Sequence, residues 1–276
     1  MKRSRSDTAQ KLSEDFKERH IDNFNKGCEA ILEIDPSLHD AISRKDFQLF
    51  LKKKQPDMTL NYHFLNLASS ILAQQISGAA ANSIKKKIID RYGHFPSFQE
   101  TAELFRQSKS QELRECGLSA RKVQYMESLA NYFNDNEQEI KALLSKENDV
   151  IASELVSNVK GIGPWSAKMF LVTSMERLDI FAADDLGIAR GCSKYLDARP
   201  DVVKDLMSKR GPVIKRSKIK HVKKNWKVYD EDIVEKCGEL FAPYRTIFMF
   251  LMWRISDTNV EVMAKREDEF TADKTS

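Results

Sequence analysis

The sequence predicts an all-α fold, and three observations support this. Apolar residues recur at helical spacing along most of the chain. Turn formers are scarce, with 10 Gly and 7 Pro among 276 residues, and no segment alternates polar and apolar residues over the length of a recognisable strand. Sandwiches, barrels and propellers are disfavoured, because they need a turn signal about every 8–12 residues. We therefore expect about ten helices joined by short connections.

The first helices follow from their apolar spacing. Phe24, Cys28 and Ile31 lie on one face of an amphipathic helix, and the same spacing covers residues 64–76. Asp35-Pro36-Ser37 and the stretch at 93–97 are rich in residues that interrupt helices. Each therefore marks a break before another helix.

Helical spacing continues through residues 104–105, 123–133 and 140–144. Both ends of the chain are polar and charged. We expect residues 1–19 and 265–276 to form disordered tails, because such segments bury too little apolar surface to order themselves.

Net charge is unevenly distributed. The formal value is +4, from 45 basic and 41 acidic residues. Nine basic residues and no acid lie between residues 209 and 227, which leaves −5 for the rest of the chain. Such a density favours a polyanionic partner. A nuclear-import signal or a solvated loop explains the count equally well.

The four cysteines are far apart and have no nearby histidine partner, which argues against a zinc site or a disulfide framework. The N-terminus lacks the apolar core of a signal peptide. The longest apolar run, residues 247–253, has seven residues, far fewer than a membrane span needs. We expect an intracellular protein that does not interact with membranes.

The most informative segment is a predicted helix, tight turn and helix at residues 151–173. Gly161 and Gly163 break the first helix, and Pro164 suits the first turn of the next. We expect both glycines to adopt positive φ and to bring backbone N–H groups close to a phosphate. The alternative is a plain corner between two helices, in which the glycines only end the first helix.

Six blocks carry a family resemblance: LASSILAQQISGAAANSI (67–84), GLSARKVQYMESLANYF (117–133), VKGIGPWSAKMFLV (159–172), IFAADDLGIARGCSKYL (180–196), RSKIKH (216–221) and FAPYRTIFMFLMWR (241–254). Together they resemble the yeast-type 3-methyladenine DNA glycosylases, also called alkylbase DNA glycosidases, of the helix-hairpin-helix Gly/Pro/Asp superfamily.

The resemblance implies two helical lobes with a DNA-binding cleft. One lobe would contain residues 20–60 and 176–264, and the other would contain residues 61–175 with the helix-hairpin-helix. The implied function is removal of alkylated purines, 3-methyladenine and 7-methylguanine, from double-stranded DNA in the nucleus, by a monomer that begins base excision repair.

The resemblance also assigns roles to residues. Asp185 is the expected catalytic carboxylate, and Asp184 would cap the following helix or support the site. Trp165 and Trp253 match base-pocket positions, while Met169 stands where a third aromatic is found in a bacterial relative. Taken alone, the acidic pair is more simply explained as a helix N-cap, and the two roles are compatible.

The implied DNA contacts lie in the loop of the Gln-Gln-Ile-Ser block, in the hairpin and in basic residues elsewhere. They are Gln75, Ile76, Ser77, Arg121, Lys122, Gly161, Gly163, Ser166, Lys218 and Lys220. No cofactor is expected for catalysis. A structural Na⁺ or K⁺ at the hairpin would be held by the backbone carbonyls of Ser157, Val159 and Ile162.

Two alternatives stay open. A protein that binds DNA damage without catalysis would keep the hairpin, although the retained Asp185 argues against it. A bifunctional glycosylase and lyase needs a lysine where this chain has Trp165.

Overall fold

The computed structural model describes residues 11–52, 57–219 and 225–258. Within the described residues the chain divides into two compact units: unit 1 contains residues 11–52, 177–219 and 225–258, and unit 2 contains residues 57–176. Residues 57–60 and Glu176 therefore belong to unit 2 and not, as expected, to the lobe formed by the two ends of the chain.

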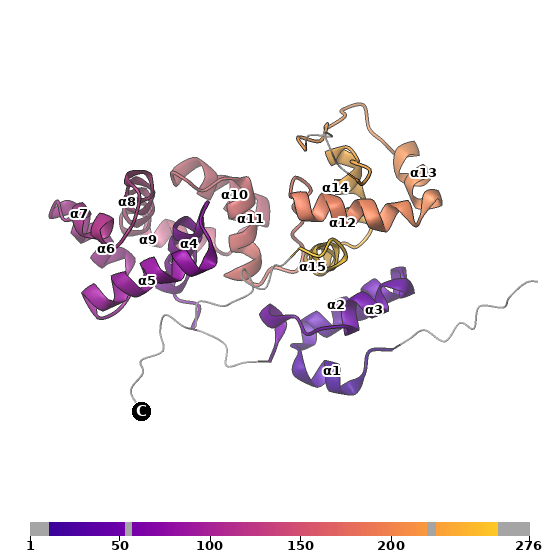
Figure 1. The fold of residues 1–276 in the computed structure, drawn as a ribbon, viewed down its shortest axis with the longest axis horizontal. Helices are drawn as coiled ribbons and strands as arrows, with labels where there is room; N and C mark the ends of the chain where they lie inside the picture. Colours follow the sequence, from indigo (N-terminus) through magenta and orange to yellow (C-terminus); the bar gives the residue numbers. More distant parts are fainter. Residues whose placement is uncertain (1–10, 53–56, 220–224, 259–276) are drawn as a thin grey trace, which may run out of the picture. The chain divides into compact units, whose positions relative to one another are not determined.

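Unit 2 is built from eight consecutive helices (Figure 1). They are α4 (Leu60–Ala73), α5 (Gly78–Tyr92), α6 (Phe98–Arg106), α7 (Ser110–Glu115), α8 (Ala120–Asp135), α9 (Glu137–Leu143), α10 (Asn148–Asn158) and α11 (Pro164–Thr173). In its core, Phe64 packs edge-on against Phe98 and Phe133, whose rings are tilted against each other, and these contacts join α4, α6 and α8.

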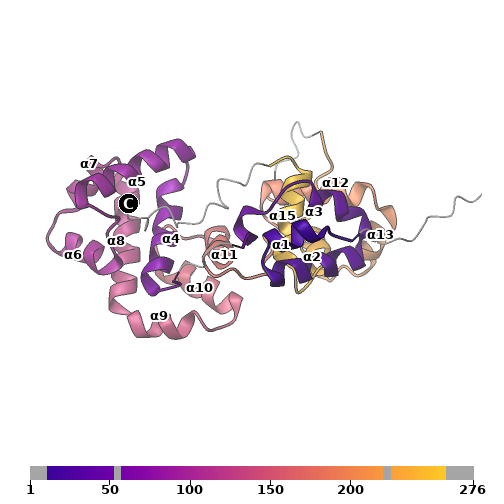
Figure 2. The same ribbon diagram turned by 90° about the horizontal axis from the view of Figure 1, so that it is seen from below.

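Unit 1 combines segments from both ends of the chain (Figure 2). Its α-helices are α1 (Glu14–Arg19), α2 (Asp22–Ile34), α3 (His39–Ser43), α12 (Leu186–Asp197), α13 (Pro200–Ser208), α14 (Glu231–Glu239) and α15 (Arg245–Ile255). Of two short 3₁₀ helices, η1 (Pro36–Leu38) lies between α2 and α3, and η2 (Gln48–Phe50) follows α3.

The predicted all-α class is confirmed for the described residues, which contain no strand beyond an isolated bridge between His20 and Leu51. The expected number of helices is too low, since the described residues form 15 α-helices. Three of these, α1, α3 and α7, have only five or six residues, too few for a periodic pattern to show in the sequence. None of the described helices is long and apolar enough to cross a membrane.

The N-terminal tail is shorter than expected. Ser13 caps α1 by accepting a hydrogen bond from the Phe16 backbone N–H at 3.2 Å. Phe16 is 2% exposed and stacks on His20, with ring centroids 4.1 Å apart. The prediction of disorder is therefore wrong for residues 12–19, because Leu12 and Phe16 are buried in the core of unit 1. The second expected tail, 265–276, lies outside the described residues.

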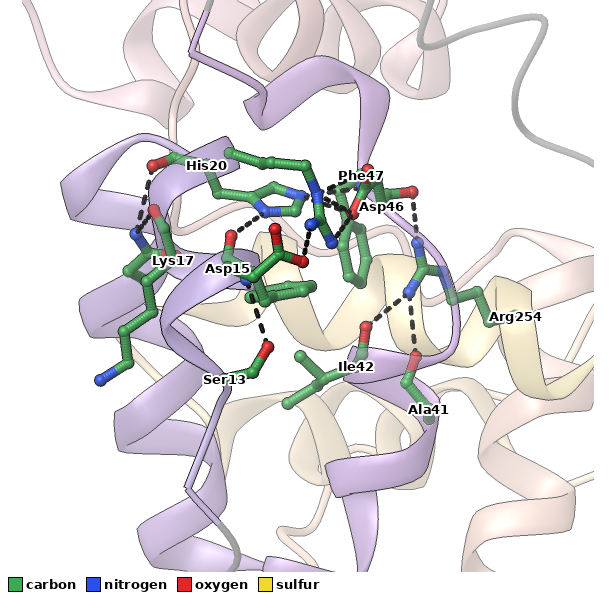
Figure 3. Close-up of polar contacts among 12 residues, drawn as sticks. Ser13, Asp15, Lys17, His20, Ala41, Ile42, Asp46, Phe47 and Arg254 are labelled. Atoms are coloured by element: carbon green, nitrogen blue, oxygen red, sulfur yellow. Dashed lines mark hydrogen bonds and ion pairs between the residues drawn. The ribbon is translucent and has the colours of Figure 1, made fainter.

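Arg254 joins the two chain segments of unit 1 (Figure 3). Its guanidinium donates to the carbonyls of Ala41 and Ile42 at 3.0 Å each, and to that of Asp46 at 2.7 Å. It also lies over the Phe47 ring, 3.3 Å from the centroid. Two of these carbonyls lie within α3 and the third follows it, so one side chain of α15 anchors the N-terminal segment of unit 1.

In unit 2, His63 on α4 lies 2.8 Å from the hydroxyl of Ser174, the residue that ends α11. Both side chains are buried. Burial disfavours the charged imidazole and lowers the pKa of His63 to about 4. A neutral histidine therefore connects α4 to the last turn of the hairpin's second helix.

Candidate functional site

The segment at 151–173 has the predicted helix, tight turn and helix. α10 ends at Asn158, and Ile162 donates its backbone N–H to the Val159 carbonyl across 3.2 Å in the turn. Gly163 is the N-cap of α11, and Pro164 is its first residue. Pro suits that position because the first-turn N–H has no intrahelical partner.

The two hairpin glycines differ in conformation. Gly161 has a φ of +86°, in the left-handed region. Gly163 has a φ of −95° and a ψ of 175°, which any residue adopts. The expectation that both have positive φ is therefore wrong for Gly163, because one left-handed residue is enough to turn the chain into α11.

Their surroundings differ as well. A Cβ on Gly161 would overlap the ring of Tyr125. A Cβ on Gly163 would have nothing within 4 Å. Gly161 is therefore required by internal packing, whereas the space beside Gly163 is open to a ligand.

Residues of α4 and α8 form hydrogen bonds to the turn between α10 and α11. Gln74, the C-cap of α4, donates its amide to the Gly161 carbonyl at 2.8 Å. Ser128 on α8 accepts the Lys160 backbone N–H at 3.0 Å. These two contacts and Tyr125 were not predicted, since each joins the turn to a residue at least 32 positions away.

The N-terminus of α11 has no side-chain cap. Gly163 has no side chain, so the N-cap residue gives no side-chain hydrogen bond to the first turn, and the N–H groups of a first turn have no acceptor within their own helix. Ser166 lies in this turn, and Trp165 beside it is half-buried. Met169 follows Trp165 by one helical turn but is 7% exposed. The geometry suits an anion near Ser166.

The loop between α4 and α5 presents its residues to solvent. Gln75 is exposed and has a φ of +58°, and Ile76 is 39% exposed. Ser77 is the N-cap of α5, and its hydroxyl accepts the Ala80 backbone N–H at 3.2 Å. Of the three predicted DNA contacts in this loop, Ser77 therefore also stabilises the protein itself, as the cap of α5.

Arg121 and Lys122 begin α8 but have different surroundings. Arg121 is exposed. Lys122 is half-buried and donates its ammonium to the carbonyl of Leu72, in the last turn of α4. Burial lowers the pKa of Lys122. Its amine therefore joins the start of α8 to the last turn of α4, while Arg121 is exposed to solvent.

Asp185 begins α12 in unit 1. Its Oδ1 accepts the backbone N–H of Ile188 at 2.9 Å and the indole N–H of Trp253 at 2.9 Å. Asp184 is exposed and does not cap the helix. The expected capping role of Asp184 is therefore wrong: the N-cap is Asp185, so the predicted catalytic carboxylate is itself the cap.

Trp253 lies in the core. It is 1% exposed, and Phe250 packs edge-on against it with ring centroids 5.2 Å apart. The expectation that Trp253 offers a ring surface to a base does not match this conformation, because both the ring and the N–H are engaged within unit 1.

The first part of the basic segment, residues 209–216, pairs with acids that precede or follow the segment in the sequence. Arg210 binds Asp232 and Asp230 at 2.6 Å each, and Arg216 also reaches Asp230. Lys215 pairs with Glu235 at 3.0 Å. The remaining ion pair is Lys209 with Asp205 at 2.8 Å.

Of the six basic residues of this segment that the structure describes, four therefore form ion pairs within unit 1. Lys218 is exposed, and Lys220 lies outside the described residues. The predicted polyanion surface is smaller than the count of charges suggests, because α13 and α14 supply acids to it.

No group of three or more His, Cys, Asp or Glu within the described ranges is placed to hold a metal ion. The four cysteines are free and buried. The three carbonyls expected to bind Na⁺ or K⁺ belong to the end of α10 and the turn, and Val159 O already accepts one hydrogen bond. A carbonyl oxygen has two lone pairs, so this donor set fits a hard monovalent cation.

Comparison with known proteins gives consistent results. Residues 68–213 match the family described as HhH-GPD superfamily base excision DNA repair protein. The chain is 51% identical over 263 residues to the DNA-3-methyladenine glycosylase of Saccharomyces cerevisiae, across 94% of this chain and 88% of the relative. It is 28% identical over 208 residues to DNA-3-methyladenine glycosylase 1 of Schizosaccharomyces pombe, across 75% of each.

Two solved structures share the fold. One is a DNA-3-methyladenine glycosidase from Bacillus halodurans, with a TM-score of 0.60, 24% identity and coverage of 91% of this chain and 98% of that one. The other is Schizosaccharomyces pombe 3-methyladenine DNA glycosylase in complex with abasic DNA, with a TM-score of 0.51, 23% identity and coverage of 86% and 92%.

Proposed function

The chain belongs to the HhH-GPD superfamily of base excision DNA repair proteins, and from this premise we propose that it is a monofunctional DNA glycosylase that removes 3-methyladenine and 7-methylguanine from double-stranded DNA. One observation carries the proposal. The carboxylate of Asp185 is held by two N–H donors at a helix N-terminus, in a chain half of whose residues are shared with a DNA-3-methyladenine glycosylase.

The chemistry requires a carboxylate near the sugar. As the C1′–N bond breaks, its electron pair leaves with the base and positive charge develops on the sugar. Asp185 stabilises that oxocarbenium-like state and orients the water that adds to C1′. A methylated purine is already cationic, so it leaves as a neutral base without a general acid.

The base has to leave the stack before Asp185 can act on it. The exposed Gln75 and Ile76 would fill the gap in the duplex, and the half-buried Trp165 would contact the extruded cationic base. The first-turn N–H groups of α11 would hold a backbone phosphate.

A monovalent cation would add a positive charge beside that phosphate, held by the carbonyls of Ser157, Val159 and Ile162. We also propose that the protein acts as a monomer in the nucleus. Both proposals follow from the resemblance of the sequence blocks to the glycosylase family.

Incubation with a methylated duplex tests the function. We expect base release, so that heating at alkaline pH cuts the strand at the damaged purine, while the strand stays intact before alkali is added. Asp185→Asn is the control and should give no breaks. Binding of the methylated duplex without release by the wild-type protein would indicate a non-catalytic damage reader instead.

A second measurement tests the absence of lyase activity. Because Trp165 stands where a lyase has its lysine, borohydride should trap no covalent protein–DNA adduct. A trapped adduct that disappears in a Lys160→Ala or Lys168→Ala variant would show that the enzyme is bifunctional.

A further inference from the structure

Trp253 and Asp185 meet although they are 68 positions apart in the chain. Trp253 lies on α15, and Asp185 precedes the first turn of α12. An indole N–H can only donate a hydrogen bond. Within the core of unit 1 it donates to Asp185 Oδ1 at 2.9 Å.

We infer that Trp253 is a positioning residue for Asp185, and that it acts through this hydrogen bond and not as a surface on which the base stacks. The inference rests on the proposed function, in which Asp185 faces the reacting sugar. Trp253 would then influence the rate of base release and leave DNA affinity nearly unchanged.

Two glycines allow α15 to approach α12 closely enough for this contact. Gly187 and Gly191 are four residues apart, so they share one face of α12. A Cβ on Gly191 would overlap the backbone of Met252, and a Cβ on Gly187 would lie 2.8 Å from Cδ1 of Trp253. The absence of side chains at both positions leaves room for the indole beside the carboxylate.

The residues around Trp253 hold its backbone in place. Its carbonyl accepts the backbone N–H of Thr258 and the hydroxyl of Ser256, both at 2.9 Å. The next residue, Arg254, donates to three carbonyls after and within α3 (Figure 3). These contacts fix the backbone at Trp253, and the fixed backbone in turn directs the indole N–H toward Asp185.

The consequence for Asp185 is a restrained carboxylate. Oδ1 accepts from both Ile188 and Trp253, and two donors from different helices oppose rotation of the carboxylate plane. Hydrogen bonds to a charged acceptor are stronger than neutral ones. Small displacements of a catalytic group are costly in rate, and a 1 Å error costs about a hundredfold.

Single-turnover base release from a methylated duplex tests the inference, with enzyme in excess and its concentration varied. Trp253→Phe keeps an aromatic ring but removes the donor. We expect the maximum rate to fall about 10- to 100-fold, with the half-saturating concentration within about twofold of wild type. Phe250→Leu is the matched control, since Phe250 packs on the same indole but its side chain has no hydrogen-bond donor, and its maximum rate should stay near wild type.

Three results would overturn the inference: an unchanged rate in Trp253→Phe, an unchanged rate with a raised half-saturating concentration, which indicates base stacking, or an equal loss of rate in Phe250→Leu, which indicates general packing. If the wild type itself releases no base, the proposed function fails, and the following measurement still tests the contact.

The indole N–H signal in ¹⁵N NMR reports the hydrogen bond in the intact protein, and it remains informative if Trp253→Phe does not fold. The chain has three tryptophans, so Trp165→Phe and Trp226→Phe assign the signals. Asp185→Asn should shift the Trp253 indole signal and leave the other two in place. A Trp253 signal that does not move would show that the contact is absent.

Discussion

The N-termini of α11 and α12 both carry the partial positive charge of a helix start, but the two helices differ in which group interacts with it. α11 begins at Gly163, which has no side chain to cap it, whereas α12 begins at Asp185, which accepts the N–H of Ile188. A helix N-terminus favours negative charge in both cases. At α11 that charge is proposed to be a DNA phosphate, and at α12 it is a carboxylate of the protein itself.

The difference explains how each site is supported. At α11 the backbone of the preceding turn has to be held in place, and the hydrogen bonds to Gly161 and Lys160 hold it. The carboxylate of Asp185 at α12 has to be held in one orientation, and the hydrogen bond from the indole of Trp253 helps to hold it. Substitutions should therefore affect binding at the first site and reaction rate at the second.

The largest expected effect is on the reaction. Asp185→Asn should lower base release by at least about a hundredfold, because the charge that stabilises the oxocarbenium is lost. Affinity for a duplex with an abasic analogue should be equal or tighter, because a carboxylate repels the phosphodiester. Asn is a good N-cap, so the melting temperature should change little.

Asp184→Asn is the matched control, because Asp184 is exposed and caps nothing. Its rate of base release should stay within about threefold of wild type. A larger loss in Asp184→Asn than in Asp185→Asn would transfer the catalytic role to Asp184.

The second effect is a loss of stability in acid, caused by His63, which joins α4 to the end of α11. The folded protein keeps His63 neutral with a pKa of about 4, against an ordinary value of 6.5. Below pH 6.5 the unfolded chain binds a proton at His63 that the folded protein does not bind. The free energy of unfolding is therefore highest, as far as His63 is concerned, above pH 6.5, and it falls as the pH is lowered toward 4. The loss amounts to about 3 kcal/mol in total.

Urea unfolding between pH 7 and pH 4 measures this loss. His63→Gln should make the stability of the protein less dependent on pH, since glutamine does not titrate. An unchanged pH dependence in that variant would mean that His63 keeps the same proton affinity in the folded and unfolded states.

The third effect separates the two hairpin glycines. Gly161→Ala should destabilise the protein by about 1–3 kcal/mol, through its positive φ and the overlap with Tyr125. Gly163→Val should cost no more than about 1 kcal/mol, because its φ is ordinary and its surroundings are open, so only the poorer capping by Val counts against it.

DNA affinity completes that comparison. Gly163→Val should weaken binding to every duplex sequence, because the added side chain occupies the proposed phosphate position. Fluorescence anisotropy with an abasic duplex measures it. Normal affinity in Gly163→Val would show that no phosphate approaches α11 there.

The smallest effect concerns the basic segment. If Lys218 contacts a phosphate, Lys218→Ala should lower the slope of log affinity against log salt by about 0.9. Lys215→Ala should leave that slope unchanged, because Lys215 pairs with Glu235. Equal slopes for the two variants and the wild type would favour the nuclear-import explanation of the segment.

Much of the fold was predictable because the signals are local. Helical spacing, the Gly-x-Gly-Pro break and an acid before a helix all act within a few residues, and α10, α11 and α12 appear where these signals place them. The short helices α3 and α7 were missed, since five or six residues give no periodic pattern.

The tertiary structure decided what depends on distant partners. Both glycines of the hairpin look alike in the sequence, yet only Gly161 lies against Tyr125. The basic segment contains no acid, yet Asp230, Asp232 and Glu235 are folded against it.

The acidic pair shows the same division. The sequence by itself determined that a carboxylate starts α12, because an N-cap interacts with its own helix. The burial of Trp253 and its hydrogen bond to Asp185 depend on how α15 packs on α12, and periodicity along either helix carries no information about that packing.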